Sequence, residues 1–159
     1  MKTVGRAAAG AVLFAVVAPG IVVGLVPCLL ARWFPEPELP VALRPLGIAL
    51  IVPGIVVLVD SMVRFVRARG TPAPVAPTEE LVVAGLYRRV RNPMYVAIVI
   101  TLIGEALVYA RAILLAYAAA MWLTFHLFVV LHEEPSLRRR FGADYEAYRR
   151  RVRRWLPRP

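Results

Sequence analysis

Long runs of residues without a charged side chain constrain this chain more than any other feature. The first run covers 25 residues, from 7 to 31, and three later runs contain at most one charge each, at about 45–63, 93–110 and 112–132. About 20 apolar residues are enough for a helix to cross a bilayer core of roughly 30 Å. With 60% hydrophobic residues in 159, we expect an all-α, multi-pass protein with a transmembrane four-helix bundle.

The first run also has features of a signal peptide, because Lys2 and Arg6 precede it. It exceeds the roughly 7 to 15 apolar residues typical of a signal peptide, and no small-x-small cleavage site is evident, so a first span is the preferred interpretation. Gly20 and Gly24 have the spacing that lets a second helix approach closely, although ordinary packing is the simpler explanation.

The cations predict the orientation of the spans. Seventeen of the 20 Lys and Arg residues fall on one side, and only Arg32, Arg44 and Arg111 fall on the other. Cytoplasmic segments carry the excess of positive charge in membrane proteins. We therefore expect a protein of the cell's inner membrane, with both termini and the loop 65–92 in the cytoplasm. Arg111 alone separates the last two spans, which predicts a tight antiparallel hairpin.

Two parts follow from this order. Residues 1–64 would form an N-terminal helical hairpin, and residues 65–159 a second part that contains the last two spans and the C-terminal region. Between them, prolines at 71–77 predict an extended spacer.

The C-terminal region is expected to form a cytoplasmic amphipathic helix over 135–152, broken near Gly142. Apolar side chains recur at helical spacing, at Leu137, Phe141, Tyr145, Tyr148 and Val152. Nine arginines between Arg138 and Arg158 occupy the other faces. Most of them are explained by contact with anionic lipid headgroups, where each cation contributes about 1 kcal/mol.

Composition excludes several classes of protein. The basic residues flank apolar spans, which indicates membrane topology rather than nucleic-acid binding. Cys28 is the one cysteine, so neither an intrachain disulfide nor a cysteine metal cluster can form, and no metal site is expected. No glycine fingerprint follows a strand, which excludes a soluble methyltransferase of the Rossmann type.

Three cytoplasmic segments are expected to meet: residues 85–95, the pair Glu133–Glu134, and the C-terminal helix. Ion pairs between the arginines of the first segment and the two glutamates are the minimal structural explanation. Two carboxylates that end a membrane helix are disfavoured by the helix dipole, so a cationic partner is expected beside them.

These segments carry motifs in a characteristic order. The motifs are Gly85-x-Tyr87-Arg88-x-Val90-Arg91-Asn92-Pro93-Met94-Tyr95, then Glu133-Glu134-Pro135-x-Leu137, Phe141-Gly142, Tyr145, Tyr148 and Val152-x-Arg154-Trp155-x-Pro157. Over about residues 78–157 the chain resembles the isoprenylcysteine carboxyl methyltransferase and phospholipid methyltransferase superfamily. Its members are integral-membrane enzymes that use S-adenosylmethionine.

The resemblance implies a role for each matching residue. Glu133 would face the ammonium of the methionine moiety, Arg91 and Asn92 its carboxylate or the ribose, and Tyr95 would lie near the sulfonium. The catalytic residues implied are Tyr95, Glu134 and Arg91, and the cofactor-binding residues are Tyr87, Val90, Arg91, Asn92, Pro93, His126 and Glu133. Many relatives have His where this chain has Asn92, and Pro where it has Leu86, so any role that needs an imidazole at position 92 is in doubt.

The expected function is methyl transfer from S-adenosylmethionine to a lipid-linked or apolar small acceptor. The absence of a dedicated base favours a carboxylate or an already neutral acceptor. The alternative is a non-catalytic membrane module that binds anionic lipid or a partner protein through its basic tail. His126 is as well explained by helix packing as by cofactor contact. For Glu105, a protonated carboxyl bonded to another helix is the preferred explanation over a functional one.

Overall fold

A computed structural model describes residues 17–35, 39–67, 81 and 83–157, with only the backbone described at 65–67. The first ten residues of the predicted first span and the proline-rich spacer lie outside this part of the chain. The described residues form α-helices and short helical turns and no strand, so the prediction of an all-α protein is confirmed.

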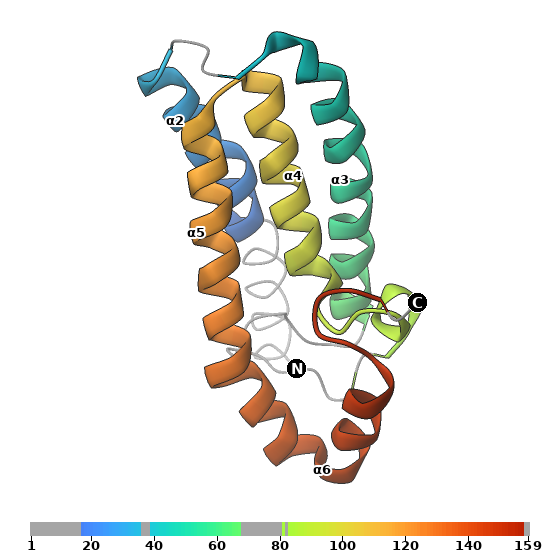
Figure 1. Ribbon diagram of the computed structural model, residues 1–159. Coiled ribbons are helices and arrows are strands. Elements are labelled where there is room, and N and C mark those ends of the chain that lie inside the picture. The colour runs from blue at the N-terminus through green and yellow to red at the C-terminus, as the bar shows by residue number, and fades with distance from the viewer. Residues whose placement is uncertain (1–16, 36–38, 68–80, 82, 158–159) are drawn as a thin grey trace, which may run out of the picture.

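The described residues begin in a helix that covers Val17–Trp33 and includes the π-helical turn η1. The elements are η1 (Gly20–Leu25), α2 (Val26–Trp33), η2 (Val41–Leu43), α3 (Arg44–Arg67), η3 (Gly85–Arg88), α4 (Pro93–Tyr109), α5 (Ala112–Phe128), η4 (Val129–Glu133) and α6 (Glu134–Arg151). In Figure 1, α2, α3, α4 and α5 run side by side, and α6 turns away from the lower end of α5.

Two of the helices are long and apolar enough to cross a membrane. They cover Val41–Arg64 and Ala112–Arg151, and shorter apolar helices cover Val17–Trp33 and Pro93–Tyr109. Together they correspond to the four runs of uncharged residues in the sequence. The helices therefore have the length and composition of a membrane protein.

The hairpin expected around Arg111 is present. Ala110 ends α4 in the left-handed conformation, with φ of 58°. The amide of Arg111 then donates to the carbonyl oxygen of Ala106 at 2.9 Å, which closes the last turn of α4 as in a Schellman motif. Ala112 begins α5 immediately afterwards.

Glycines allow α3 and α4 to approach closely. A Cβ on Gly104 would lie 2.7 Å from the carbonyl oxygen of Gly47, and one on Gly54 would collide with the hydroxyl of Thr101. Small residues let helix backbones pack tightly in membranes. Gly20 and Gly24 do not have this role among the described residues, because a Cβ at either position would have nothing within 4 Å.

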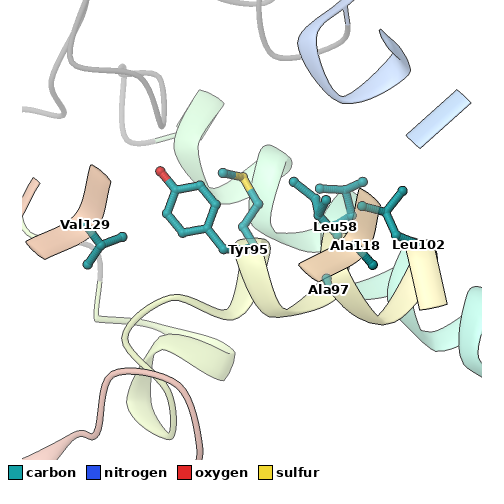
Figure 2. Packing of buried hydrophobic residues seen from close by; sticks show 8 residues of the cluster. Leu58, Tyr95, Ala97, Leu102, Ala118 and Val129 are labelled. Atoms are coloured by element: carbon teal, nitrogen blue, oxygen red, sulfur yellow. The ribbon is translucent and has the colours of Figure 1, made fainter. Parts of the chain in front are cut away.

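The apolar core lies where α3, α4, α5 and η4 meet. Its buried members include Leu58, Ala97, Leu102, Ala118 and Val129. Tyr95 belongs to the same cluster, and Figure 2 shows its hydroxyl directed away from Leu58 and Leu102. The ring of Tyr95 stacks on Phe125 with a centroid separation of 4.7 Å.

One expectation about the helices is wrong. The fourth apolar helix does not end at Glu133 and Glu134, because α5 continues through the π-helical η4 into α6 without a loop. The two carboxylates therefore do not face the negative end of a helix dipole, and the argument from the dipole fails. The helix is interrupted later, at Gly142, where φ of 49° and ψ of −118° produce the kink that the sequence predicts.

Candidate functional site

The C-terminal residues return to the segment that precedes α4. The backbone around Val90 pairs with Arg153, and the amide of Arg91 donates to the carbonyl oxygen of Arg153 at 2.9 Å. The Asn92 side chain donates to the carbonyl oxygen of Arg154 at 3.2 Å. In Figure 1 the C-terminal end accordingly lies beside η3. Two of the three segments expected to meet are thus joined.

Tyrosines of α6 strengthen this junction. The hydroxyl of Tyr148 donates to the carbonyl oxygen of Tyr87 at 2.6 Å, and Tyr145 packs beside it with a ring separation of 6.4 Å. Tyr145 and Val152 are buried, and Leu137, Phe141 and Tyr148 are partly buried. The apolar stripe predicted for the C-terminal helix therefore faces the protein, while Arg138, Arg139 and Arg140 are exposed.

Glu134 is held by two arginines. Nε and Nη2 of Arg154 lie 2.7 and 3.0 Å from the two carboxylate oxygens, as a bidentate pair. Nη1 of Arg91 approaches Oε1 of Glu134 at 3.2 Å, and both side chains are more than nine-tenths buried. Burial alone raises the pKa of Glu134, but the hydrogen bond from Arg154 and the charges of both arginines hold it below its usual range. Glu134 is therefore an ionised member of a buried ion-pair network.

Glu133 has a different environment. Its Oε2 accepts a hydrogen bond from the hydroxyl of Tyr95 at 3.1 Å, and no Lys or Arg among the described residues forms an ion pair with it. Burial raises the pKa of Glu133 to about 7, and the charge of Glu134 acts in the same direction, while the Tyr95 hydrogen bond opposes it. Glu133 is thus a partly buried carboxylate beside an ion-pair network, with no cation of its own in the described part of the chain.

Arg91 retains an unused donor. Nη1 donates to the hydroxyl of Tyr145 at 3.2 Å in addition to its ion pair with Glu134. Its Nε is buried and has no hydrogen-bond partner among the described residues. A buried donor without an acceptor is costly, and such groups normally have a partner.

The structure places His126 in an aromatic cluster at the end of α5. The indole nitrogen of Trp155 donates to Nδ1 of His126 at 3.2 Å. The His126 ring also lies 5.4 Å from that of Trp122. This arrangement corresponds to the packing role considered for His126, and its proposed contact with a cofactor stays a prediction.

Glu105 and Asp60 differ in their relation to the Glu133 region. Glu105 lies ten residues after Tyr95 in α4. Its Oε2 is buried, and the described residues offer it no hydrogen-bond partner, so the expected bond to another helix is not seen at this atom. Asp60 pairs with Arg64 one turn later, at 2.7 Å, and the charges of both Asp60 and Glu133 act on the hydroxyl of Tyr87.

Most of the predicted site residues are brought together. Tyr95 contacts Glu133, Arg91 contacts Glu134, and Asn92, Val90 and Tyr87 are tied to the C-terminal part of the chain. Their catalytic and cofactor-binding roles stay predictions. Sequence reasoning did not identify Arg154 as the second cation of Glu134. The sequence signal that could have indicated this role is the place of Arg154 in the motif Val152-x-Arg154-Trp155.

Two helices are long and apolar enough to cross a membrane, and buried polar side chains gather where the segment before α4 meets α6 and the C-terminal residues. Residues 43–144 match the family described as phospholipid methyltransferase, which is more than half of the chain. The chain belongs to this family. Membership implies a membrane methyltransferase. No curated protein matches the chain.

The family match and the motif resemblance overlap without coinciding. The match begins at residue 43, just before α3 starts, and stops at residue 144, within α6. It contains Tyr87 to Tyr95 and both glutamates, and it excludes Arg154 and Trp155. The pairing of the C-terminal residues with η3 and α4 is thus a feature that the structure adds.

Proposed function

We propose that this protein transfers a methyl group from S-adenosylmethionine to a lipid-linked or apolar small acceptor. The observation that carries the proposal is that Glu133 accepts a hydrogen bond from Tyr95 but has no ion-pair partner among the described residues, beside an ion-pair network that already satisfies Glu134. S-adenosylmethionine carries an ammonium that matches Glu133. A charge-assisted hydrogen bond of this kind contributes about 1.5 to 3 kcal/mol when partly buried.

The other residues present fit the same cofactor. Nε of Arg91, which has no hydrogen-bond partner among the described residues, is a donor for the cofactor's carboxylate or a ribose hydroxyl. Asn92 donates one amide hydrogen to the carbonyl oxygen of Arg154, so its side-chain oxygen is available to accept a hydrogen bond from the ribose. Tyr87, Val90 and Pro93 would line the adenosine, and Tyr95, held by Glu133, would lie near the sulfonium.

The chain's own residues would bind and orient the reactants. The bound cofactor supplies an activated methyl group. Well-oriented proximity accounts for roughly 7 to 11 kcal/mol of a barrier, and burial of the site excludes water. Glu133, whose pKa burial raises to about 7, is the nearest possible base, and in this proposal the ammonium of the cofactor occupies it. No other described side chain of this region is placed to deprotonate an amine, which favours a carboxylate or neutral acceptor. Glu134 would position Arg91 rather than react.

We further propose the topology that the charges predict. Four spans would cross the cell's inner membrane, with both termini and the site in the cytoplasm. The N-terminal hairpin 1–64 would support a catalytic core formed by 65–159. A lipophilic acceptor would enter from the bilayer, between helices. Membrane lipids are the partners expected.

Isothermal titration with S-adenosylmethionine tests the proposal. Glu133→Gln should weaken binding about tenfold or more, because the ammonium would lose its counter-ion. Glu146→Gln is the matched control, since Glu146 pairs with Arg138 and Arg149 on the outer face of α6. It should leave the affinity unchanged.

Transfer of labelled methyl into a membrane lipid extract would then identify the acceptor. Equal affinity in the parent protein and Glu133→Gln would reject the role of Glu133. If the protein binds no S-adenosylmethionine but binds anionic lipid without either glutamate, the non-catalytic alternative is correct.

A further inference from the structure

A cavity of about 510 Å³ lies between the segment before α4 and the second half of α6. Its apolar wall includes Leu81, Val83 and Val152, and its charged lining consists of Arg88, Arg151 and Asp144. Neither glutamate of the proposed methyl-transfer site lines it, nor do Arg91 and Tyr95. The hydrogen bond from Tyr148 to the carbonyl oxygen of Tyr87 joins the two sides of the cavity.

The two arginines of this cavity are available to a ligand. Arg88 belongs to η3 and Arg151 ends α6, and both side chains are exposed. Neither forms an ion pair with any described residue, whereas Arg138, Arg149 and Arg154 all pair with glutamates. Unpaired guanidinium groups from two elements thus line one cavity that also has an apolar wall.

The charges define the ligand more closely. Guanidinium groups bind phosphate oxygens through paired hydrogen bonds. With Asp144, the three charged lining groups carry a net charge of +1. A phosphodiester, with one negative charge, balances this better than a phosphate with two. The cavity is larger than a phosphate, and Leu81, Val83 and Val152 can cover the apolar atoms that a phosphodiester carries in a lipid.

We propose that this cavity binds the phosphodiester of an anionic phospholipid headgroup. Arg88 and Arg151 hold the phosphate, and the glycerol with the first carbons of the chains lies on the apolar wall. The site is separate from methyl transfer and does not depend on it. It gives the basic C-terminal region one defined lipid contact, in place of attraction spread evenly over nine arginines.

The test measures binding of a soluble short-chain lipid to the full-length protein in a neutral detergent. The probe is dihexanoyl phosphatidylglycerol, compared with dihexanoyl phosphatidylcholine and with inorganic phosphate. The double variant Arg88→Gln/Arg151→Gln removes both guanidinium groups of the cavity. Its matched control, Arg89→Gln/Arg139→Gln, removes one exposed arginine from each of the same two regions, and neither of these lines the cavity.

We expect the cavity variant to bind phosphatidylglycerol about tenfold or more weakly, and the control variant to stay within about twofold of the parent protein. Asp144→Asn should bind it more tightly. Circular dichroism and thermal unfolding check that each variant is folded; should the double variant unfold, the single variants decide, each weakening binding severalfold. Equal losses in the cavity and control variants would show diffuse attraction and overturn the proposal. Equal binding of phosphatidylcholine, or of inorganic phosphate, would overturn the assignment to an anionic lipid.

Discussion

Glu133 and Glu134 follow one another in the sequence, yet their side chains have opposite electrostatic environments. Glu134 lies between Arg91 and Arg154, which keep its pKa low. Glu133 meets the hydroxyl of Tyr95, and burial raises its pKa to about 7. A carboxylate that has no cationic partner among the described residues thus lies next to one that two arginines neutralise. Under the proposed function, this difference distinguishes a residue that binds the cofactor from one that supports the site.

The raised pKa of Glu133 makes cofactor affinity depend on pH. Only the ionised carboxylate pairs with an ammonium, so binding should weaken as the pH falls below about 7. Between pH 7 and pH 6 the dissociation constant for S-adenosylmethionine should rise roughly fivefold, since the ammonium stays charged there. Titration calorimetry at both pH values measures this. In Glu133→Gln the difference should vanish; a parent protein with the same affinity at both would contradict the ionisation assigned to Glu133.

Glu134 is expected to matter chiefly for stability. Glu134→Gln leaves the guanidinium groups of Arg91 and Arg154 without their anion. Loss of one partner from a fully buried pair costs about 3 to 5 kcal/mol, and the partial exposure of Arg154 places the expected cost toward the lower end of that range. Thermal unfolding in detergent, followed by circular dichroism, should show a clear decrease in midpoint. Glu146→Gln removes a carboxylate from more exposed pairs and should cost less than about 1 kcal/mol. Equal midpoints for the two variants would show that the network does not stabilise the fold.

At the scale of the elements, α3 and α4 are joined by close backbone approach. The carbonyl oxygens of Gly47 and Gly104 each occupy the space that a Cβ on the other residue would need. Backbone atoms cannot turn aside as the end of a long side chain can. The position of α4 against α3, and with it the position of Tyr95 and Asn92, therefore depends on two glycines.

Gly104→Ala is predicted to destabilise this contact. The new methyl group would lie 2.7 Å from the carbonyl oxygen of Gly47 and equally close to Ile51, and overpacking of this kind costs about 1 to 3 kcal/mol. Gly24→Ala is the matched control, because no atom of the described residues lies within 4 Å of its Cβ position. It should be neutral or stabilising by up to about 1 kcal/mol. Thermal unfolding compares the two. A stable Gly104→Ala protein would mean that α3 and α4 can separate without cost.

At the scale of the whole molecule, the proposed topology sets the side of the membrane on which the site lies. Arg44 at the start of α3 and Arg139 in α6 are both exposed, and the four-span arrangement assigns them to opposite faces. Cys28 is the one cysteine of the chain. Its replacement by Ser would allow single cysteines to report on each face.

In that background, Arg44→Cys should react with a membrane-impermeant maleimide on intact cells. Arg139→Cys should react only after the membrane is opened, because the proposed topology assigns α6 and the site to the cytoplasm. Labelling measured by a mass shift on denaturing gels gives the result. Reaction of Arg139→Cys from outside the cell would reverse the topology and place Glu133 away from cytoplasmic S-adenosylmethionine.

Hydrophobic patterning predicted the existence of the described helices. Runs without charge predicted the ends of α3 and α4 within about four residues, because a helix in lipid must satisfy its backbone internally and must present apolar side chains around its whole surface. They did not predict that α5 continues through η4 into α6. Arg111 predicted the hairpin, Gly142 predicted the kink, and the spacing of apolar residues predicted the buried stripe of α6. The motifs from Tyr87 to Tyr95 and at Glu133–Glu134 also sufficed to indicate the family.

Tertiary structure decided what each polar residue of the site contacts. The sequence cannot distinguish Glu133 from Glu134. Their difference arises from the directions in which the two side chains point where η4 ends and α6 begins. Nor does the sequence indicate that Arg154 returns to Glu134, because that contact joins residues 20 positions apart across a kink. Local pattern determines which segments become helices, whereas the partner of a buried charge depends on how those helices and the C-terminal residues pack together.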